Sequence, residues 1–183
     1  MRDPALRLEE LCAAVESRQR IKWLFFWGHE SPAGGVTRAC LSQWYPSVFE
    51  VDGVSYPTAE HWMMAEKARL FGDAGALQRI LAAPHPGAAK AIGREVRAFD
   101  EAAWSAARYG IVVRGNLAKF SAADSLREFL LGSHQRVLVE ASPLDYVWGI
   151  GLAGEDERAR QPSLWRGSNL LGFALMEVRE RLS

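Results

Sequence analysis

One predicted helix carries two charged residues that could take part in chemistry. The stretch SYPTAEHWMMAEKARLF covers residues 55–71, and Thr58 can cap a helix that runs to about Leu70. Glu60 then lies in the first turn and Lys67 lies seven positions later, almost two whole turns, so both side chains lie on one face. The rise over seven residues is about 10.5 Å, and a lysine side chain leans back toward the helix start. A sugar-sized ligand therefore fits between the two groups.

The charge state of Glu60 is open from the sequence. The positive end of the helix favours a carboxylate, which acts as a base or stabilises a developing cation, whereas burial favours the protonated acid. Acids are common in first helical turns, and Trp62, Met63 and Met64 have the spacing of core residues, so the helix alone is more typical of packing. Glu60 and Lys67 together favour a site, because nothing else in the helix accounts for two charges beside so much apolar surface.

A second carboxylate, Asp145, begins the segment DYVWGIG. Loop aspartates usually cap turns, but two carboxylates at one cleft can cleave a glycosidic bond, one handling the proton of the leaving group and one acting on water or on the oxocarbenium-like transition state. The GxGxxG match at residues 149–154 lacks the strand and helix of a dinucleotide site, so we exclude that fold. Backbone amides beside Trp148 could instead contact a phosphate. Arg114 and Lys119 are candidate phosphate contacts if their helix face meets the cleft.

The composition limits the class of protein. The chain has 183 residues, enough for one compact domain. Its 22 basic and 22 acidic residues give a formal net charge of +0, so it lacks the electrostatic footprint of a protein that grips long nucleic acid. Recognition of a single nucleotide is compatible with this balance. Seven tryptophans are many for this length, and we expect most in the core, although an indole in a cleft can stack a heterocycle.

Other functional classes are not indicated. Cys12 and Cys40 have no CxxC spacing and the four histidines are scattered, so we predict neither a disulfide framework nor a metal site. No apolar run approaches the roughly 18 residues of a membrane-spanning helix. The start MRDPALRLEE lacks the uninterrupted apolar region of a signal peptide. We therefore expect a cytoplasmic protein without a membrane anchor.

The elements that position these residues are predicted to be mostly helical, in a single mainly α domain with a small β-hairpin and one or two short strands. Asp52-Gly53 predicts the hairpin turn within residues 48–56. Helices are predicted after the caps Asp3 and Thr58, at 73–82, after Pro86, at 100–120 and at 121–131. A last helix has Leu171, Leu175, Val178 and Leu182 on one stripe. Strands are predicted within 21–27 and 136–141, a glycine-rich surface loop at 28–40, and an irregular connection at 143–168. A connection of that length often lines a functional site.

Five segments carry a resemblance to a known family. FFWGHE, YPTAEHWMMAEKA, RGNLAKF, LVEASPLDYVWGIGL and NLLGFALMEVRERL follow in this order from about Trp23 to the C-terminus, and in them the chain resembles the YbiA-like, or NADAR, family. The resemblance implies a mainly helical domain at residues 23–183, with residues 1–22 as an N-terminal helix packed on it. It also implies cleavage of an N-glycosidic bond without a metal or a redox cofactor. Some members hydrolyse ribosylamino-pyrimidine phosphates of riboflavin synthesis, and others remove ADP-ribose from guanine in nucleic acid.

The resemblance also implies residue roles by position. It places the key glutamate of the family at Glu60, the lysine of the same helix at Lys67 and the acid of the D-x-x-W-G segment at Asp145. It places substrate-binding positions at Trp104, Arg114, Lys119, Trp148, Gly149 and Asn169. The FFWGHE segment departs from shorter members, and Trp27 and His29 are further candidates for substrate contact.

These residues lead to the hypothesis of an N-glycosidase that hydrolyses a small phosphorylated ribosyl N-glycoside, a ribosylamino-pyrimidine phosphate. Glu60 moves protons, and Asp145 orients water or stabilises positive charge. Lys67 either binds an oxygen or phosphate group, or forms a Schiff base with the opened ribosylamine. Two alternatives remain: a hydrolase that removes ADP-ribose from guanine in nucleic acid, and a non-catalytic module that binds ADP-ribose or a nucleotide. The presence of all three groups disfavours the binding module.

Overall fold

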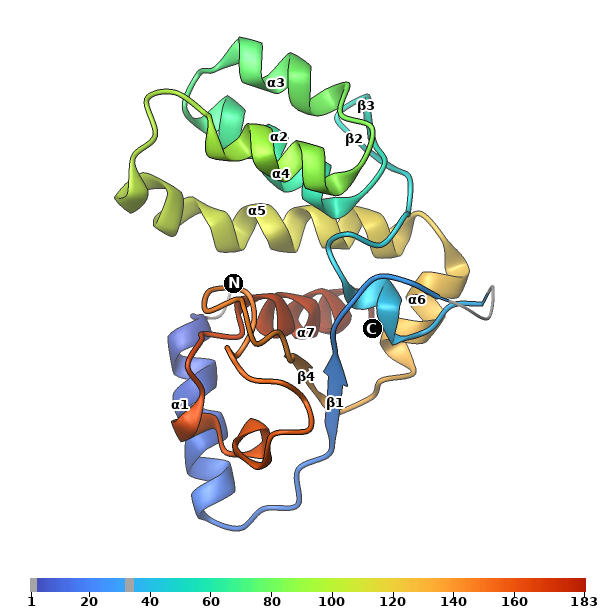
Figure 1. Cartoon of the computed structure of the whole chain (residues 1–183). Coiled ribbons are helices and arrows are strands. Elements are labelled where there is room, and N and C mark those ends of the chain that lie inside the picture. Colours follow the sequence, from blue (N-terminus) through green and yellow to red (C-terminus); the bar gives the residue numbers. More distant parts are fainter. Residues whose placement is uncertain (1–2, 32–34) are drawn as a thin grey trace.

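The predicted mainly helical architecture is confirmed. The computed structural model describes residues 3–31 and 35–183 (Figure 1). Within them the chain forms helices α1 (Pro4–Glu16), α2 (Ala59–Leu70), α3 (Ala74–Leu81), α4 (Pro86–Arg94), α5 (Glu101–Ser121), α6 (Asp124–Leu131) and α7 (Leu170–Leu182), strands β1 (Trp23–Phe26), β2 (Phe49–Val51), β3 (Val54–Tyr56) and β4 (Val137–Glu140), and short 3₁₀ turns η1 (Arg38–Leu41), η2 (Glu157–Arg160) and η3 (Pro162–Leu164). None of the helices in these ranges is long and apolar enough to cross a membrane.

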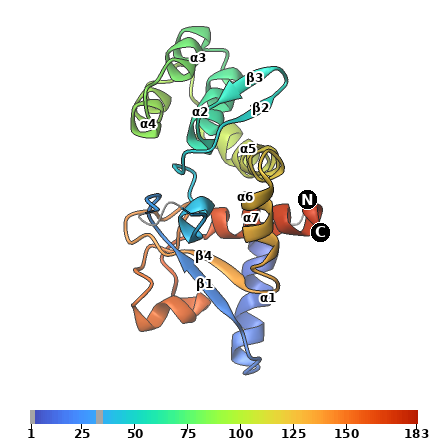
Figure 2. The same ribbon diagram turned by 90° about the vertical axis from the view of Figure 1, so that its right-hand side faces the viewer.

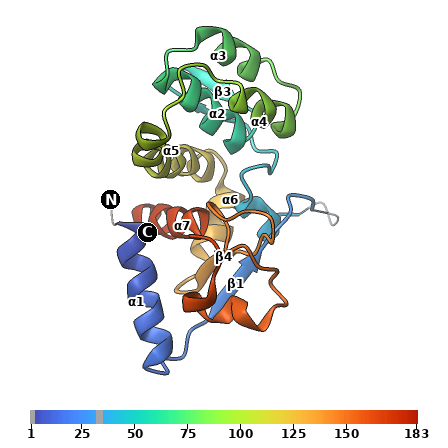
Figure 3. The same ribbon diagram turned by 60° about the vertical axis from the view of Figure 1, so that its left-hand side comes forward.

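The long helix α5 lies in the middle of the molecule. Figure 1 shows α2, α3, α4 and the β2–β3 hairpin on one side of α5, and α7, α1 and the strands β1 and β4 on the other. The turned views in Figures 2 and 3 keep this order of layers, and α5 contacts both α2 and α7. The helix therefore joins the layer that carries Glu60 to the layer that carries Asp145.

Local sequence signals fix the element boundaries. Thr58 caps α2, because its side-chain oxygen accepts a hydrogen bond from the His61 N–H at 3.4 Å, and Asp3 caps α1 in the same way. Strands β2 and β3 pair antiparallel, and Asp52 and Gly53 between them both have positive φ, at 52° and 77°. The hairpin and both caps were predicted from the sequence and are confirmed.

The glycine-rich segment at 28–40 differs in part from the predicted surface loop. Its end forms η1, in which Ala39 and Cys40 are buried, since the Thr37 side chain caps the turn by accepting from the Ala39 N–H at 3.3 Å. Residues 32–34 of the predicted loop lie outside the described residues. The segment thus enters the core just before it reaches the site.

Two strands far apart in the chain form a parallel pair. Trp23 of β1 lies opposite Val137 of β4, and Phe26 lies opposite Glu140. Helix α7 packs tightly against β4 at Gly172, where an added Cβ would come within 2.2 Å of the Leu138 carbonyl oxygen. This close approach holds the end of β4 against the start of α7.

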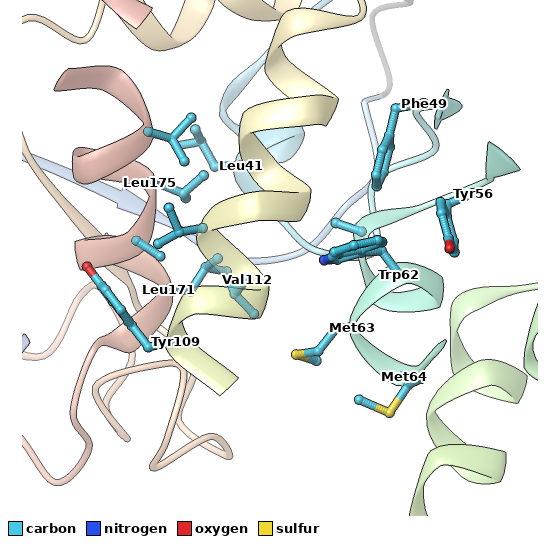
Figure 4. Packing of buried hydrophobic residues seen from close by; sticks show 14 of the residues in the cluster. Leu41, Phe49, Tyr56, Trp62, Met63, Met64, Tyr109, Val112, Leu171 and Leu175 are labelled. Atoms are coloured by element: carbon cyan, nitrogen blue, oxygen red, sulfur yellow. The ribbon is translucent and has the colours of Figure 1, made fainter. Parts of the chain in front are cut away.

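The core fills both faces of α5. Figure 4 shows Trp62, Met63 and Met64 of α2 on one side, and Leu171 and Leu175 of α7 on the other. These five side chains are buried, so the prediction that the three α2 residues belong to the core is confirmed. The helices α2 and α5 are also joined by a hydrogen bond from the Trp62 indole N–H to the carbonyl oxygen of Ile111 at 2.8 Å.

Candidate active site

A cavity of about 270 Å³ lies where α2, α4 and α5 meet the segment at 42–44, the end of β4 and the following connection. Its lining combines three kinds of side chain. The carboxyl groups are Glu60, Glu140 and Asp145; the cations are Lys67, Lys90, Arg94 and Arg108; the tryptophans are Trp44, Trp104 and Trp148. The predicted residues Glu60, Lys67, Asp145, Trp104 and Trp148 are therefore brought together at one cavity.

Glu60 is buried at the start of α2, with 2% of its surface exposed. Its backbone N–H donates to the carbonyl oxygen of Gln43 at 2.9 Å, and its Oε1 has no hydrogen-bond partner within the described residues. Burial raises the pKa of Glu60 to about 7, and nearby Asp145 adds to this, against the opposing effects of Lys90 and a hydrogen bond from the Trp44 side chain. A carboxyl group with this pKa can both accept and release a proton near neutral pH.

Lys67 lies further along α2, at the opposite end of the lining. Its ammonium group donates to the carbonyl oxygen of Gly93 at 2.8 Å and lies over the ring of Phe99, 4.2 Å from the centroid. The Trp104 ring is also near, at 5.6 Å. Burial lowers the pKa of Lys67, and Glu101 partly opposes this. The amine therefore loses its proton more readily than an exposed lysine does.

Asp145 both shapes its loop and faces the cavity. Its Oδ1 accepts hydrogen bonds from the backbone N–H groups of Val147 at 2.9 Å and Trp148 at 2.7 Å. This is the turn-capping role common for loop aspartates. The turn also places Trp148 in the cavity wall, so the structural role of Asp145 and its position beside the carboxyl cluster occur together.

Glu140 is a site residue that sequence reasoning missed. It is the last residue of β4, where its N–H donates to Asn169 Oδ1 at 3.0 Å and its carbonyl oxygen accepts from the Ile150 N–H at 2.9 Å. Its Oε2 is buried without a hydrogen-bond partner in the described part of the chain. Burial raises the pKa of Glu140 to about 8, with further upward effects from Asp145 and Glu60. An acid at the carboxyl end of an apolar strand could have indicated a site, because ligands bind at such strand ends.

The cationic side of the cavity comes largely from α4 and α5. Lys90 and Arg94 line it from α4, and Arg108 lines it from α5. The Lys90 ammonium lies 5.8 Å from the centroid of the Trp44 ring, and the His29 ring lies near the same indole, with 5.6 Å between the two ring centroids. Sequence reasoning did not name these cations, because the docking of α4 has no local sequence signal.

Two predicted phosphate contacts lie outside this lining. Arg114 is half-exposed on α5, where it forms an ion pair with Asp52 of the hairpin and lies over the Trp62 ring. Lys119 is fully buried, and its ammonium donates to the carbonyl oxygens of Cys40 at 2.7 Å and Ser42 at 2.8 Å. Lys119 thus holds the segment that leads into the cavity wall.

The other predicted contacts, Asn169, Gly149, Trp27 and His29, are also not part of the cavity lining. Asn169 is buried and clamps β4, since it accepts from Glu140 and its Nδ2 donates to the Leu138 carbonyl oxygen at 3.0 Å. Gly149 packs closely against the Glu140 backbone, where an added Cβ would come within 2.8 Å of the carbonyl oxygen. Trp27 is 63% exposed, and His29 reaches the site only through its contact with Trp44. Asn169, Gly149 and His29 therefore contact lining residues without forming the lining, whereas Trp27 lies on the surface.

The described residues contain no group of three or more histidine, cysteine, aspartate or glutamate side chains arranged to hold a metal ion. The site consists of protein acids, cations and indoles around one cavity. The fold and this site define a mainly helical domain with a cavity whose charged and aromatic lining suits a small polar ligand.

Comparisons with known proteins identify the family. The NADAR domain family matches residues 25–183. N-glycosidase R617 of Acanthamoeba polyphaga mimivirus is 38% identical over 164 residues, covering 87% of this chain and 95% of that protein. N-glycosidase YbiA of Escherichia coli (strain K12) is 31% identical over 134 residues, covering 73% and 75%. The NMR structure of the E. coli protein YbiA has a TM-score of 0.71 and 27% identity, covering 90% of this chain and 86% of that one. The chain belongs to the NADAR family, as its sequence predicted.

Proposed function

We propose that this protein is an N-glycosidase that hydrolyses the C–N glycosidic bond of a ribosylamino-pyrimidine phosphate. Relatives named N-glycosidases support the reaction type. The observation that carries the proposal is the meeting of three carboxyl groups with four cations and three indoles at one cavity. Proton transfer at a glycosidic bond uses the carboxyl groups, a phosphate group pairs with the cations, and a heterocyclic base stacks on the indoles.

The carboxyl groups divide the chemistry according to their pKa values. Glu140 has the higher pKa and holds a proton at neutral pH, so it donates that proton to the leaving nitrogen as the C–N bond breaks. Asp145 stabilises the positive charge that develops at the anomeric carbon. Glu60 accepts a proton from water as the water oxygen bonds to that carbon. A proton then passes from Glu60 to Glu140, directly or through solvent, and restores both groups, so that in one turnover water loses one proton and the leaving base gains one.

Lys67 has two chemically distinct roles at this site. As an ammonium ion it binds a substrate oxygen or phosphate. As a neutral amine it attacks C1 of the ring-opened imine form of the substrate and displaces the amine of the base, which leaves a Schiff base on Lys67 that water then hydrolyses. Borohydride reduction during turnover separates the two. A reduced substrate adduct on Lys67 assigns the covalent role, and its absence under active turnover assigns the binding role.

The first experiment compares wild type with Glu60→Gln on two substrates. One is a ribosylamino-pyrimidine phosphate, followed by release of the base, and the other is an oligonucleotide that carries ADP-ribosyl guanine, followed by release of ADP-ribose. We expect wild type to cleave the first substrate and Glu60→Gln to lose this activity. Glu66→Gln is the matched control, because Glu66 lies on the same helix and pairs with Arg69.

The outcomes of this assay separate the alternatives. Cleavage of only the modified oligonucleotide makes the protein an ADP-ribosyl hydrolase for guanine and contradicts the proposal. Cleavage of neither, with tight binding of ADP-ribose to wild type and to Glu60→Gln, makes it a binding module. Loss of activity in Glu66→Gln equal to that in Glu60→Gln shows a general effect on the helix and removes the catalytic assignment.

A further inference from the structure

Gln43 has a position fixed directly beside Glu60. It lies in the segment between η1 and the hairpin, and its backbone carbonyl oxygen accepts the Glu60 N–H at 2.9 Å. Its side chain is 6% exposed and lines the cavity. Neither the comparisons nor the carboxyl chemistry assigns a role to this residue.

A chain of hydrogen bonds fixes which end of the Gln43 amide remains free. Asn116 Nδ2 donates to the Val112 carbonyl oxygen at 2.9 Å, and a carbonyl oxygen can only accept. The same Nδ2 donates to Gln43 Oε1 at 2.8 Å, so Gln43 must turn its oxygen toward Asn116. The other end, Nε2, is buried without a hydrogen-bond partner among the described residues. Gln43, a residue of the cavity lining, therefore carries a buried donor that cannot be exchanged for an acceptor by an amide flip.

An unpaired buried donor destabilises a fold, so its presence at a cavity points to an acceptor on the ligand. A hydroxyl group can donate or accept, so either end of an amide binds it and the fixed orientation gives no advantage. A phosphate group is matched by the cations of the site. A ring carbonyl only accepts, and an amino group in its place only donates, so the fixed N–H group distinguishes these two.

We propose that Gln43 determines specificity by donating a hydrogen bond from Nε2 to a carbonyl oxygen on the ring of the leaving base. The substrate class is then the N-glycosides of oxo-pyrimidines and oxo-purines, and bases with an amino group at that position are disfavoured. This inference rests on the proposed N-glycosidase function of the same site. Asn116 is the positioning residue that keeps the amide oriented.

Binding of free products tests the inference without any need for hydrolysis. The probes are a diaminopyrimidinone, the triaminopyrimidine that has an amino group in place of its carbonyl oxygen, and ribose phosphate. Quenching of tryptophan fluorescence reports binding, because three indoles line the cavity. We expect wild type to bind the carbonyl base about tenfold more tightly than the amino base, the preference that one hydrogen bond supplies.

Two variants separate recognition from a general structural effect. Gln43→Met keeps a side chain of similar volume without the amide, so we expect it to lose the preference between the two bases and to keep ribose phosphate affinity. Asn116→Leu keeps the Gln43 amide but removes the hydrogen bond that fixes its orientation. We therefore expect the ratio of affinities for the carbonyl base and the amino base to become smaller. Each preference is a ratio measured on one protein sample, so partial unfolding affects both probes equally and cancels.

Several outcomes would overturn the inference, and one further outcome separates it from the proposed function. A wild type that binds both bases equally, or binds neither, shows that Nε2 does not recognise a carbonyl group. A preference that survives in Gln43→Met assigns it to another residue, and loss of ribose phosphate affinity alone assigns Gln43 to the sugar. Carbonyl preference without hydrolysis of any substrate removes the proposed function and leaves the recognition role of Gln43 intact.

Discussion

Glu60 and Glu140 are two buried carboxyl groups that face the same cavity. The helix N-terminus favours the charged form of Glu60, but burial outweighs this effect and raises its pKa to about 7. Glu140 is not at a helix start, and its pKa is raised further, to about 8. Both groups therefore change charge close to neutral pH, where one of them can act as an acid while the other acts as a base.

The pH dependence of kcat/KM follows from these two groups. Glu60 must be charged to accept a proton, so activity falls as the pH drops through about 7. Glu140 must be protonated to donate, so activity falls as the pH rises through about 8. We expect a bell-shaped profile, with both limbs belonging to the coupled cluster. In Glu140→Gln the rate falls about a hundredfold and the alkaline limb disappears. A steady-state profile of both proteins checks this, and an alkaline limb that persists in the variant contradicts the assignment.

Asp145→Asn separates the two roles of Asp145. The amide keeps an Oδ1 that accepts from Val147 and Trp148, so the turn should remain and the free energy of unfolding should change by less than about 1 kcal/mol. The negative charge is lost, and with it the stabilisation of the developing cation, so we expect kcat to fall about a hundredfold. Thermal unfolding and steady-state kinetics on the same sample measure the two effects. A large loss of stability with unchanged kcat would show that Asp145 only shapes the loop.

At the scale of elements, local signals made much of the fold predictable. The caps Asp3 and Thr58 and the turn at Asp52-Gly53 act within a few residues, so the sequence alone shows them. The pairing of β1 with β4 brings together segments more than 100 positions apart, and nothing local encodes it. Glu140 is at the end of that pair, and for this reason it was missed while Glu60 and Lys67, within one helix, were found.

The direction of a helix face, like the pairing of distant strands, could not be predicted from the local sequence. Arg114 and Lys119 were candidate phosphate contacts on the condition that their face of the helix meets the cleft, because the sequence gives the period of a helix but not the direction of its faces. The direction of that face depends on how α5 packs between α2 and α7, which is a property of the whole fold. The structure turns Lys119 inward to the Cys40–Ser42 segment and Arg114 outward to the hairpin.

Lys119 is expected to support the site through its hydrogen bonds to the segment that leads into the cavity lining. In Lys119→Met the carbonyl oxygens of Cys40 and Ser42 lose a buried donor, so we expect the free energy of unfolding to fall by about 1–3 kcal/mol. The segment carries Gln43 and Trp44, so KM should rise more than kcat falls. Denaturant unfolding and kinetics measure both. Arg114→Met on the same helix is the control, because exposed ion pairs contribute about 0–1 kcal/mol, and an equal loss in the two variants would contradict the special role of Lys119.

At the scale of the whole molecule, the site exists only when distant layers are assembled. Glu60 comes from α2, Glu140 from β4 and Asp145 from the connection before α7, and α5 lies between the first layer and the other two. Placing Glu60 and Glu140 together at a buried site opposes folding, since burial and mutual repulsion disfavour their charged forms. The fold therefore holds the cluster together against its own electrostatics, and removal of one member should stabilise the protein.

The pH dependence of the free energy of unfolding shows at which pH values the removal of Glu140 should stabilise the protein. The pKa of Glu140 is about 8 in the folded protein against 4.5 as the ordinary value, so between these pH values the folded state binds more protons than the unfolded state. The free energy of unfolding then decreases as the pH rises through this window and is constant with respect to Glu140 above it. Glu140→Gln removes this dependence. We therefore expect the free energy of unfolding of the variant to exceed that of wild type by on the order of 5 kcal/mol near pH 9 and by little near pH 4.

Buried Lys119 has the opposite effect on the free energy of unfolding, which it makes rise with pH above about pH 7, because burial lowers the pKa of Lys119 to about 7. That contribution is common to wild type and Glu140→Gln and cancels in their difference. Urea unfolding of both proteins at a series of pH values measures the difference directly. Glu128→Gln, on α6, is the matched control and should show no such trend. A stability difference that stays constant with pH would mean that Glu140 is charged in the folded protein, and the acid role in catalysis would then pass to Glu60.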